Sequence, residues 1–166
     1  MSSVVQSSLK VQDRTPPRRR LIGLHQKMKL RRLEPNWVWW ASEEKLYYKL
    51  LRGFTLHVCC GKSQIGDVRV DADALLRPDV VADMFHLPFK RHSFESAIID
   101  PPWEEWDFRY LYELKDIAKR VVLIHKTLPR FRGMKLVEVW IASKVNILAK
   151  IVSVWEKAHS ELSRWF

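Results

Sequence analysis

Cysteine is scarce in this chain of 166 residues, which contains only Cys59 and Cys60. Adjacent cysteines cannot bridge each other without strain, and they lack the spacing of a CxxC half-site for zinc. Their scarcity excludes a disulfide framework and a zinc scaffold. The histidines offer no replacement, because His86, His92 and His125 show no metal-ligand spacing. We therefore predict no metal site.

Long hydrophobic runs are also missing. No stretch approaches the roughly 20 apolar residues of a membrane span, and the N-terminal segment lacks the apolar core of a signal peptide. We expect a soluble, intracellular protein of the cytoplasm with no membrane partner. Hydrophobic residues still make up 47% of the chain, which is enough to bury the core of one ordinary domain.

Acidic residues are nearly absent from the first 33 positions, which hold nine of the 29 basic residues and one of the 19 acidic residues. This segment therefore carries +8 of the net +10. We predict a basic, largely flexible arm over residues 1–33 and one folded domain over residues 34–166. The run Arg18-Arg19-Arg20 is typical of attraction to phosphate backbones. A solubilising tail and a protein-binding segment are the alternatives.

Hydrophobic periodicity predicts an α/β fold. Helical spacing is expected over 37–52 and 108–119, and β-rich runs predict strands over 54–60, 67–71, 80–83, 94–100 and 120–125. Two further runs, 135–143 and 148–156, predict an antiparallel hairpin at the C-terminal end. A helix over 145–158 is the competing interpretation.

The motif Asp100-Pro101-Pro102-Trp103 follows the apolar strand that ends at Ile99. It resembles the catalytic motif of class I S-adenosylmethionine-dependent amino-methyltransferases, and this version is most typical of enzymes that methylate N6 of adenine. The motif lies about 40 residues after the Gly-containing strand end at Gly61, in the order of that family. The resemblance covers roughly residues 54–126 and implies a Rossmann-like sheet.

The same resemblance implies a site for S-adenosylmethionine built from the ends of the first three strands. Asp71 would bind the ribose hydroxyls, as acidic residues do in dinucleotide folds, with Asp73 as its rival. Asp83 and Met84 would meet the adenine of the cofactor, and turn capping is the alternative for Asp83. The implied cofactor-binding set is His57, Cys59, Cys60, Gly61, Asp71, Asp83 and Met84.

Three features depart from the family pattern. His57 stands where an acidic residue is usual, and Cys59 replaces the first glycine of the G-x-G loop. Residues 62–66 are also too few for a crossover helix between the first two strands. We therefore predict a pared-down methyltransferase sheet that lacks several crossover helices. A sheet face left bare would be covered by a second copy of the chain or by another protein.

The resemblance assigns the methyl-accepting chemistry to the Asp100 motif. A carboxylate at Asp100 and the carbonyl of Pro101 would accept both N–H groups of an amino group, which favours its lone pair for attack. Pro102 stiffens the loop, and Trp103 offers a face for stacking a flipped base. Lys126, after the 120–125 strand, is a candidate phosphate contact, although a solvated charge is the alternative.

The predicted function is methyl transfer to N6 of adenine in nucleic acid, with DNA somewhat favoured over RNA. Another acceptor, such as a guanine, a cytosine or a protein side-chain amide, is the first alternative. A noncatalytic nucleic-acid-binding scaffold with the same fold is the second.

Overall fold

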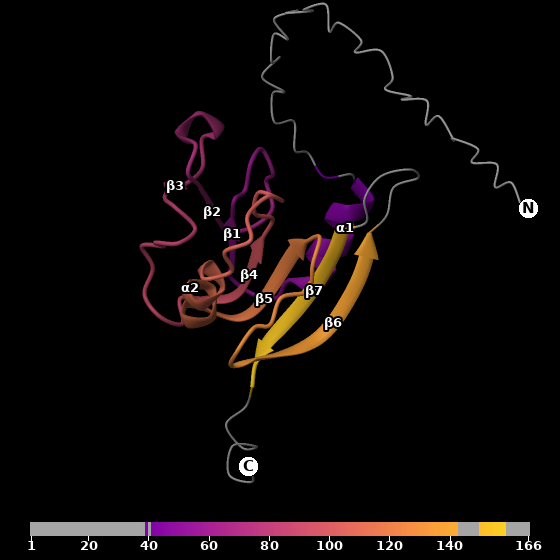
Figure 1. Cartoon of the computed structure of the whole chain (residues 1–166). Coiled ribbons are helices and arrows are strands. Elements are labelled where there is room, and N and C mark those ends of the chain that lie inside the picture. Colours follow the sequence, from indigo (N-terminus) through magenta and orange to yellow (C-terminus); the bar gives the residue numbers. More distant parts are fainter. Residues whose placement is uncertain (1–38, 40, 143–149, 159–166) are drawn as a thin grey trace, which may run out of the picture. The chain divides into compact units, whose positions relative to one another are not determined.

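The computed structural model describes residues 39, 41–142 and 150–158. Two α-helices, one 3-10 helix and seven strands make up this part of the chain (Figure 1). In chain order they are α1 (Ala41–Leu50), β1 (Thr55–Val58), β2 (Val68–Asp71), the 3-10 helix η1 (Ala74–Leu76), β3 (Val80–Val81), β4 (Phe94–Ile99), α2 (Tyr110–Ile117), β5 (Ala118–His125), β6 (Met134–Ala142) and β7 (Lys150–Lys157).

The seven strands form one sheet in the order β3-β2-β1-β4-β5-β7-β6. The first five of these are parallel, and β7 is antiparallel to both β5 and β6. The parallel part has the strand order of the doubly wound dinucleotide-binding fold. The predicted Rossmann-like α/β sheet with a C-terminal antiparallel hairpin is therefore found. The competing helix over 145–158 is wrong for its described part, where Lys150–Lys157 is a strand.

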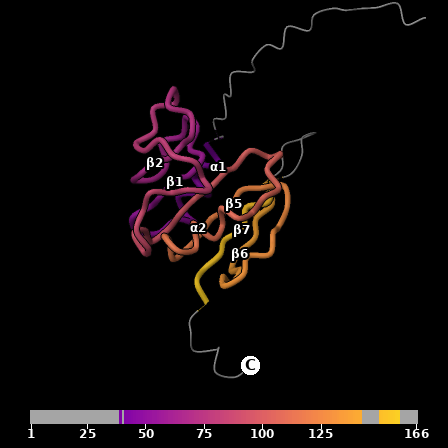
Figure 2. The backbone as a smooth tube through the Cα atoms, turned by 60° about the vertical axis from the view of Figure 1, so that its left-hand side comes forward, coloured from indigo at the N-terminus to yellow at the C-terminus, as the bar shows by residue number. Residues whose placement is uncertain are grey.

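Both faces of the central strands are buried, each under one helix (Figure 2). Because successive side chains of a strand point to opposite faces, Ile99 packs on the α2 side and Ile98 packs on the α1 side. The helices are shorter than predicted, since α1 ends at Leu50 and α2 covers only Tyr110–Ile117. The predicted residues 37, 38 and 40 lie outside the described residues.

The crossovers between neighbouring parallel strands are short, as predicted. No α-helix lies between β1 and β2, and only η1 lies between β2 and β3. The chain returns from β1 to β2 through Gly66, whose φ of +97° and close approach to His57 leave no room for a side chain. A Cβ at this position would lie 3.0 Å from that of His57. Glycine at 66 is therefore part of how so short a crossover is made.

A bare face over the middle of the sheet is not found among the described residues, because α1, α2 and loop residues such as Ile65 and Leu87 cover it. Exposed apolar side chains instead gather on the edge strand β6, at Val137, Val139, Trp140 and Ile141. The described part of the chain therefore covers its own central strands, and binding of a second copy or of another protein stays a prediction.

Candidate active site

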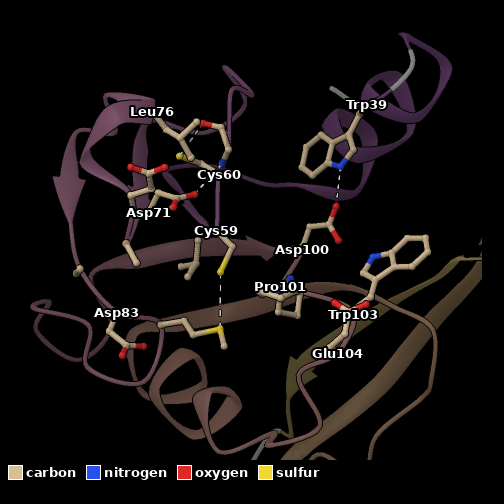
Figure 3. A pocket seen from close by; sticks show the side chains of 17 residues that line it. Trp39, Cys59, Cys60, Asp71, Leu76, Asp83, Asp100, Pro101, Trp103 and Glu104 are labelled. Carbon is tan, nitrogen blue, oxygen red and sulfur yellow. Dashed lines mark hydrogen bonds between the residues drawn. The ribbon is translucent and has the colours of Figure 1, made fainter. Parts of the chain in front are cut away.

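The carboxyl ends of β1, β2 and β4 surround a cavity of about 490 Å³ (Figure 3). Ligands of open parallel sheets bind at this end of the strands. The sequence-predicted residues Gly61, Asp71, Asp83 and Asp100 all line this cavity. Cys59, Cys60, Met84, Pro101, Pro102 and Trp103 line it as well. Cys59 and Trp103, 44 positions apart in the sequence, are thereby brought to one cavity.

Backbone N–H groups from the loops after β1 and β2 donate to the side chain of Asp71, at the end of β2. Gly61 N donates to Asp71 Oδ2 at 2.9 Å, and Asp73 N donates to Asp71 Oδ1 at 3.0 Å. Asp73 itself accepts from Leu75 N and caps η1. Of the two rival carboxylates, Asp71 is thus the one that organises the loop, and Asp73 has a capping function.

Cys59 adopts φ 54°, in the left-handed region that favours glycine. The chain therefore keeps the backbone turn of a glycine-rich loop although its first glycine is replaced. The Cys59 thiol lies 3.7 Å from the Met84 sulfur, and burial raises its pKa above the usual range. Burial also raises the pKa of Cys60 to about 11. Neither thiol is activated as a nucleophile, since both pKa values move away from the thiolate form.

Asp83 begins the loop after β3. Its Oδ1 accepts a hydrogen bond from Phe85 N at 3.0 Å, so the turn-capping contact is present. Its side chain also lines the cavity beside Met84. Because a carboxylate has about four acceptor positions, capping leaves Asp83 able to bind a ligand as well.

Asp100 ends β4 on the other side of the cavity, between two tryptophans (Figure 3). Trp39 Nε1 donates to Asp100 Oδ2 at 2.9 Å, and the Trp103 side chain also hydrogen-bonds to this carboxylate. Burial raises the pKa of Asp100, and these two hydrogen bonds together with the charge of Lys150 oppose that rise. The net effect is a raised pKa, so Asp100 is a stronger base than an exposed aspartate.

Lys150, the first residue of β7, reaches this side of the cavity. Its ammonium lies 5.9 Å from the centre of the Trp103 ring and 3.3 Å from Glu43 Oε1 of α1. The Lys150 and Glu43 side chains are only 15% and 13% exposed. This shielded ion pair places a positive charge near Asp100 and fixes one face of Trp103.

His57 does not take the predicted position among the cofactor contacts. Its side chain is fully buried on the α1 face of β1, where the ring stacks on Trp39 with centroids 5.0 Å apart. Nδ1 donates to Ile65 O at 3.0 Å, and burial lowers its pKa to about 4. The ring is therefore neutral at pH 7. It supports the cavity from behind and does not line it.

Lys126 does not line the cavity. Its ammonium is 5.5 Å from the centre of the exposed Trp106 ring. The neighbouring His125 donates from Nε2 to Glu105 O at 3.2 Å and accepts from Thr127 N at 3.2 Å. This histidine fastens the loop after Trp103 to β5. The predicted phosphate contacts Arg18, Arg19 and Arg20 lie outside the described residues.

Sequence reasoning missed Trp39, Glu43 and Lys150, which surround Asp100. Trp39 is 61 positions away from Asp100, and no local motif marks any of the three. Among the described residues, no group of three or more His, Cys, Asp or Glu side chains is placed to hold a metal ion. None of the helices in this part of the chain has the length and hydropathy needed to cross a membrane.

No protein-family model and no curated protein matches the sequence. Protein 1320 of Thermoplasma acidophilum is structurally similar with a TM-score of 0.44 and 12% identity, over 71% of this chain and 83% of that one. Magnesium protoporphyrin IX methyltransferase from Synechocystis PCC 6803, crystallised with SAM, has a TM-score of 0.43 and 12% identity, over 70% and 76%. Similarities this low do not decide the family.

Proposed function

We propose that the chain is an S-adenosylmethionine-dependent methyltransferase that acts on an exocyclic amino group, N6 of adenine in nucleic acid. The observation that carries the proposal is one cavity with two different sides. One side holds Gly61, Asp71 and Asp83, and the other holds the motif that begins with Asp100. A volume of about 490 Å³ is in the range of small-molecule sites, which hold roughly 300–1,000 Å³.

The residues on the first side fit a nucleoside cofactor. Asp71 uses two of its roughly four acceptor positions for backbone N–H groups. The remaining positions suit the two hydroxyls of a ribose. Gly61, with φ 55° and no side chain, lets a ligand approach the backbone closely. When bound, S-adenosylmethionine supplies a methyl group on a positively charged sulfur.

The residues on the second side suit an amino acceptor. Asp100 and the carbonyl of Pro101 accept its two N–H bonds, which turns the nitrogen lone pair toward the cofactor. With S-adenosylmethionine bound, the nitrogen would take its methyl group, and the electron pair of the broken carbon–sulfur bond would stay on the sulfur. The surplus proton on nitrogen passes to Asp100, whose raised pKa suits it as a base. Trp103 lines the cavity, and its aromatic ring suits stacking on a base.

Nucleic acid is the proposed substrate class because the predicted arm, with Arg18, Arg19 and Arg20, concentrates positive charge on an otherwise nearly neutral chain. Lys126 and Trp106, on the segments that follow β5 and the Asp100 motif, add a cation and an exposed ring. DNA is proposed ahead of RNA as the substrate. Single strands are proposed ahead of duplex, because flipping a base from a duplex costs a few kcal/mol. A second copy of the chain or another protein is the proposed source of sequence selection.

The first test is calorimetry with S-adenosylmethionine and S-adenosylhomocysteine. Binding with a thermal shift supports the proposal, whereas no heat and no shift favour a noncatalytic scaffold.

The second test is transfer of a labelled methyl group to single- and double-stranded DNA and RNA, followed by mass analysis of the digested product. N6-methyladenine is expected. Detection of methylguanine, methylcytosine or a methylated protein amide instead would show that guanine, cytosine or a protein amide is the acceptor and that adenine is not.

The role of the arm is tested by deletion of residues 1–20. We expect weaker nucleic-acid binding and a smaller dependence of affinity on salt, with unchanged affinity for the cofactor. An equal loss of cofactor affinity would show that the arm is part of the folded site. Light scattering at the assay concentration tests self-association, and a monomer would remove the second copy from the proposal.

A further inference from the structure

Trp39 is held in place on two sides. Its indole stacks on the buried His57 ring at an interplanar angle of 20°, and its ring meets Tyr47 edge-on with centroids 4.5 Å apart. Only 7% of Trp39 is exposed. An indole has one N–H donor in a fixed direction. The two ring contacts therefore fix where that donor points, which is toward Asp100 (Figure 3).

We propose that Trp39 is a positioning residue for Asp100, which it holds in one orientation and keeps ionised for the amino acceptor. This inference rests on the proposed function. Trp39 Nε1 occupies one acceptor position on Oδ2 at 2.9 Å. The carboxylate cannot rotate without breaking this bond, so its remaining acceptor positions keep a fixed relation to Pro101. His57 acts one step behind, as the neutral surface on which the indole rests.

The charged and titratable groups around Asp100 explain why a neutral donor matters. Glu43 of α1 opposes the ionised form, and the Tyr47 and Cys59 side chains interact with the same carboxylate. Lys150 of β7 favours the ionised form, but it is also paired with Glu43. Hydrogen bonding to a carboxylate lowers its pKa. Loss of the indole N–H should therefore raise the pKa of Asp100 further.

The first experiment needs no substrate. The Trp39 indole N–H resonance is assigned in the wild type by triple-resonance NMR and followed from about pH 3 to about pH 8, across the ordinary titration range of carboxyl groups. We expect it to move with the protonation of Asp100 and to become independent of that titration in Asp100→Asn. A resonance that does not respond in the wild type would overturn the inference. This result does not depend on activity or on the folding of a Trp39 variant.

The second experiment compares Trp39→Phe with Trp140→Phe. Trp140 is a matched control because its Nε1 also donates to a carboxylate oxygen, Glu138 Oε2, at 3.2 Å. Trp140 is half-exposed on β6 and does not line the cavity. We expect Trp39→Phe to lower kcat about ten- to hundredfold, as for loss of a hydrogen bond to a charged group. The acid limb of its pH profile should move to higher pH, with cofactor affinity unchanged. Trp140→Phe should alter none of these.

Failure of the inference about Trp39 can be distinguished from failure of the proposed function. Absence of methyl transfer by the wild type would remove the proposed function, and the NMR titration would still show whether Trp39 reports on Asp100. If the wild type is active and Trp39→Phe retains its kcat and acid limb, Trp39 is only a packing residue. In an Asp100→Asn background, Trp39→Phe should have little further effect on kcat, because the two residues act through one contact.

Discussion

The two sides of the cavity are built by different means. On the cofactor side, defined by Gly61, Asp71 and Asp83, the carboxylates are fixed by backbone N–H groups that lie two or ten positions away. On the acceptor side, defined by Asp100 and Trp103, the carboxylate is fixed by side chains such as Trp39, 61 positions away. Local turns therefore suffice for the first side, whereas the second requires the whole fold.

The difference also extends to charge. Asp71 and Asp83 accept hydrogen bonds from neutral amides near the surface of the loops. Asp100 is surrounded by two indoles and the shielded Lys150–Glu43 pair, and burial raises its pKa. The carboxylates that we propose for binding and for reaction thus have different environments in the same cavity. We expect substitutions on the two sides to change different measured quantities.

The largest effect should come from Asp100→Asn, which removes the charge on the acceptor side. We expect kcat to fall by at least about 100-fold, the usual cost of losing one group that stabilises developing charge. Cofactor affinity, measured by calorimetry, should change little because Asp71 and Gly61 are unaltered. Wild-type kcat in this variant would show that Asp100 does not react and that the two sides do not have different roles.

Arg120→Met should destabilise the packing of α1 and the β6–β7 hairpin on β5. Arg120 is buried, and its guanidinium pairs with Glu156 and Glu138 of the hairpin while Nε donates to Leu50 O of α1 at 2.8 Å. Its removal leaves carboxylates without their partner and should lower the free energy of unfolding by about 3–5 kcal/mol in urea titrations. Arg120→Lys keeps the charge but loses the fork geometry of the guanidinium, so its free energy of unfolding should lie between those of the wild type and Arg120→Met. A loss below about 1 kcal/mol would show that the network is dispensable.

His57 lies behind the cavity, where it contacts Ile65 O and the Trp39 ring, and it should make stability depend on pH. Burial lowers its pKa from 6.5 to about 4, so the folded state keeps it neutral. This contribution is complete above about pH 6.5 and is lost as the pH falls toward about 4, by about 3 kcal/mol. His57→Asn can still donate to Ile65 O and has no such titration. Equal pH dependence of unfolding in the two proteins would refute this assignment.

The smallest effect should come from Asp71→Asn on the cofactor side. An amide cannot accept from both Gly61 N and Asp73 N through two equivalent oxygens. We expect about tenfold weaker cofactor binding by calorimetry, as for loss of one charge-assisted hydrogen bond. At saturating cofactor, kcat should stay within a few-fold of the wild type. A large loss of kcat with unchanged affinity would reverse the proposed roles of the two sides.

The same division explains what the sequence could predict. Periodicity predicts the strands that carry Gly61, Asp71 and Asp100, and the resemblance in motif order implies that these residues share one site; all three line the cavity. The positions of Trp39 and Lys150 depend on how α1 and the hairpin pack, which no local pattern encodes. His57, expected among the cofactor contacts, instead packs against Trp39, because a position in a loop motif does not reveal which side of the strand its ring takes.

The short return from β1 to β2 has a consequence for the order of folding. Loop closure costs less entropy for nearby residues, and the pairing of Leu56 with Val68 joins residues much closer in sequence than Trp39 and Asp100. We expect the cofactor side to form early and the indole–carboxylate contact to form among the last steps. Ligand binding and catalytic competence would then be acquired at different times during refolding, with the Trp39 indole as the reporter of the later event.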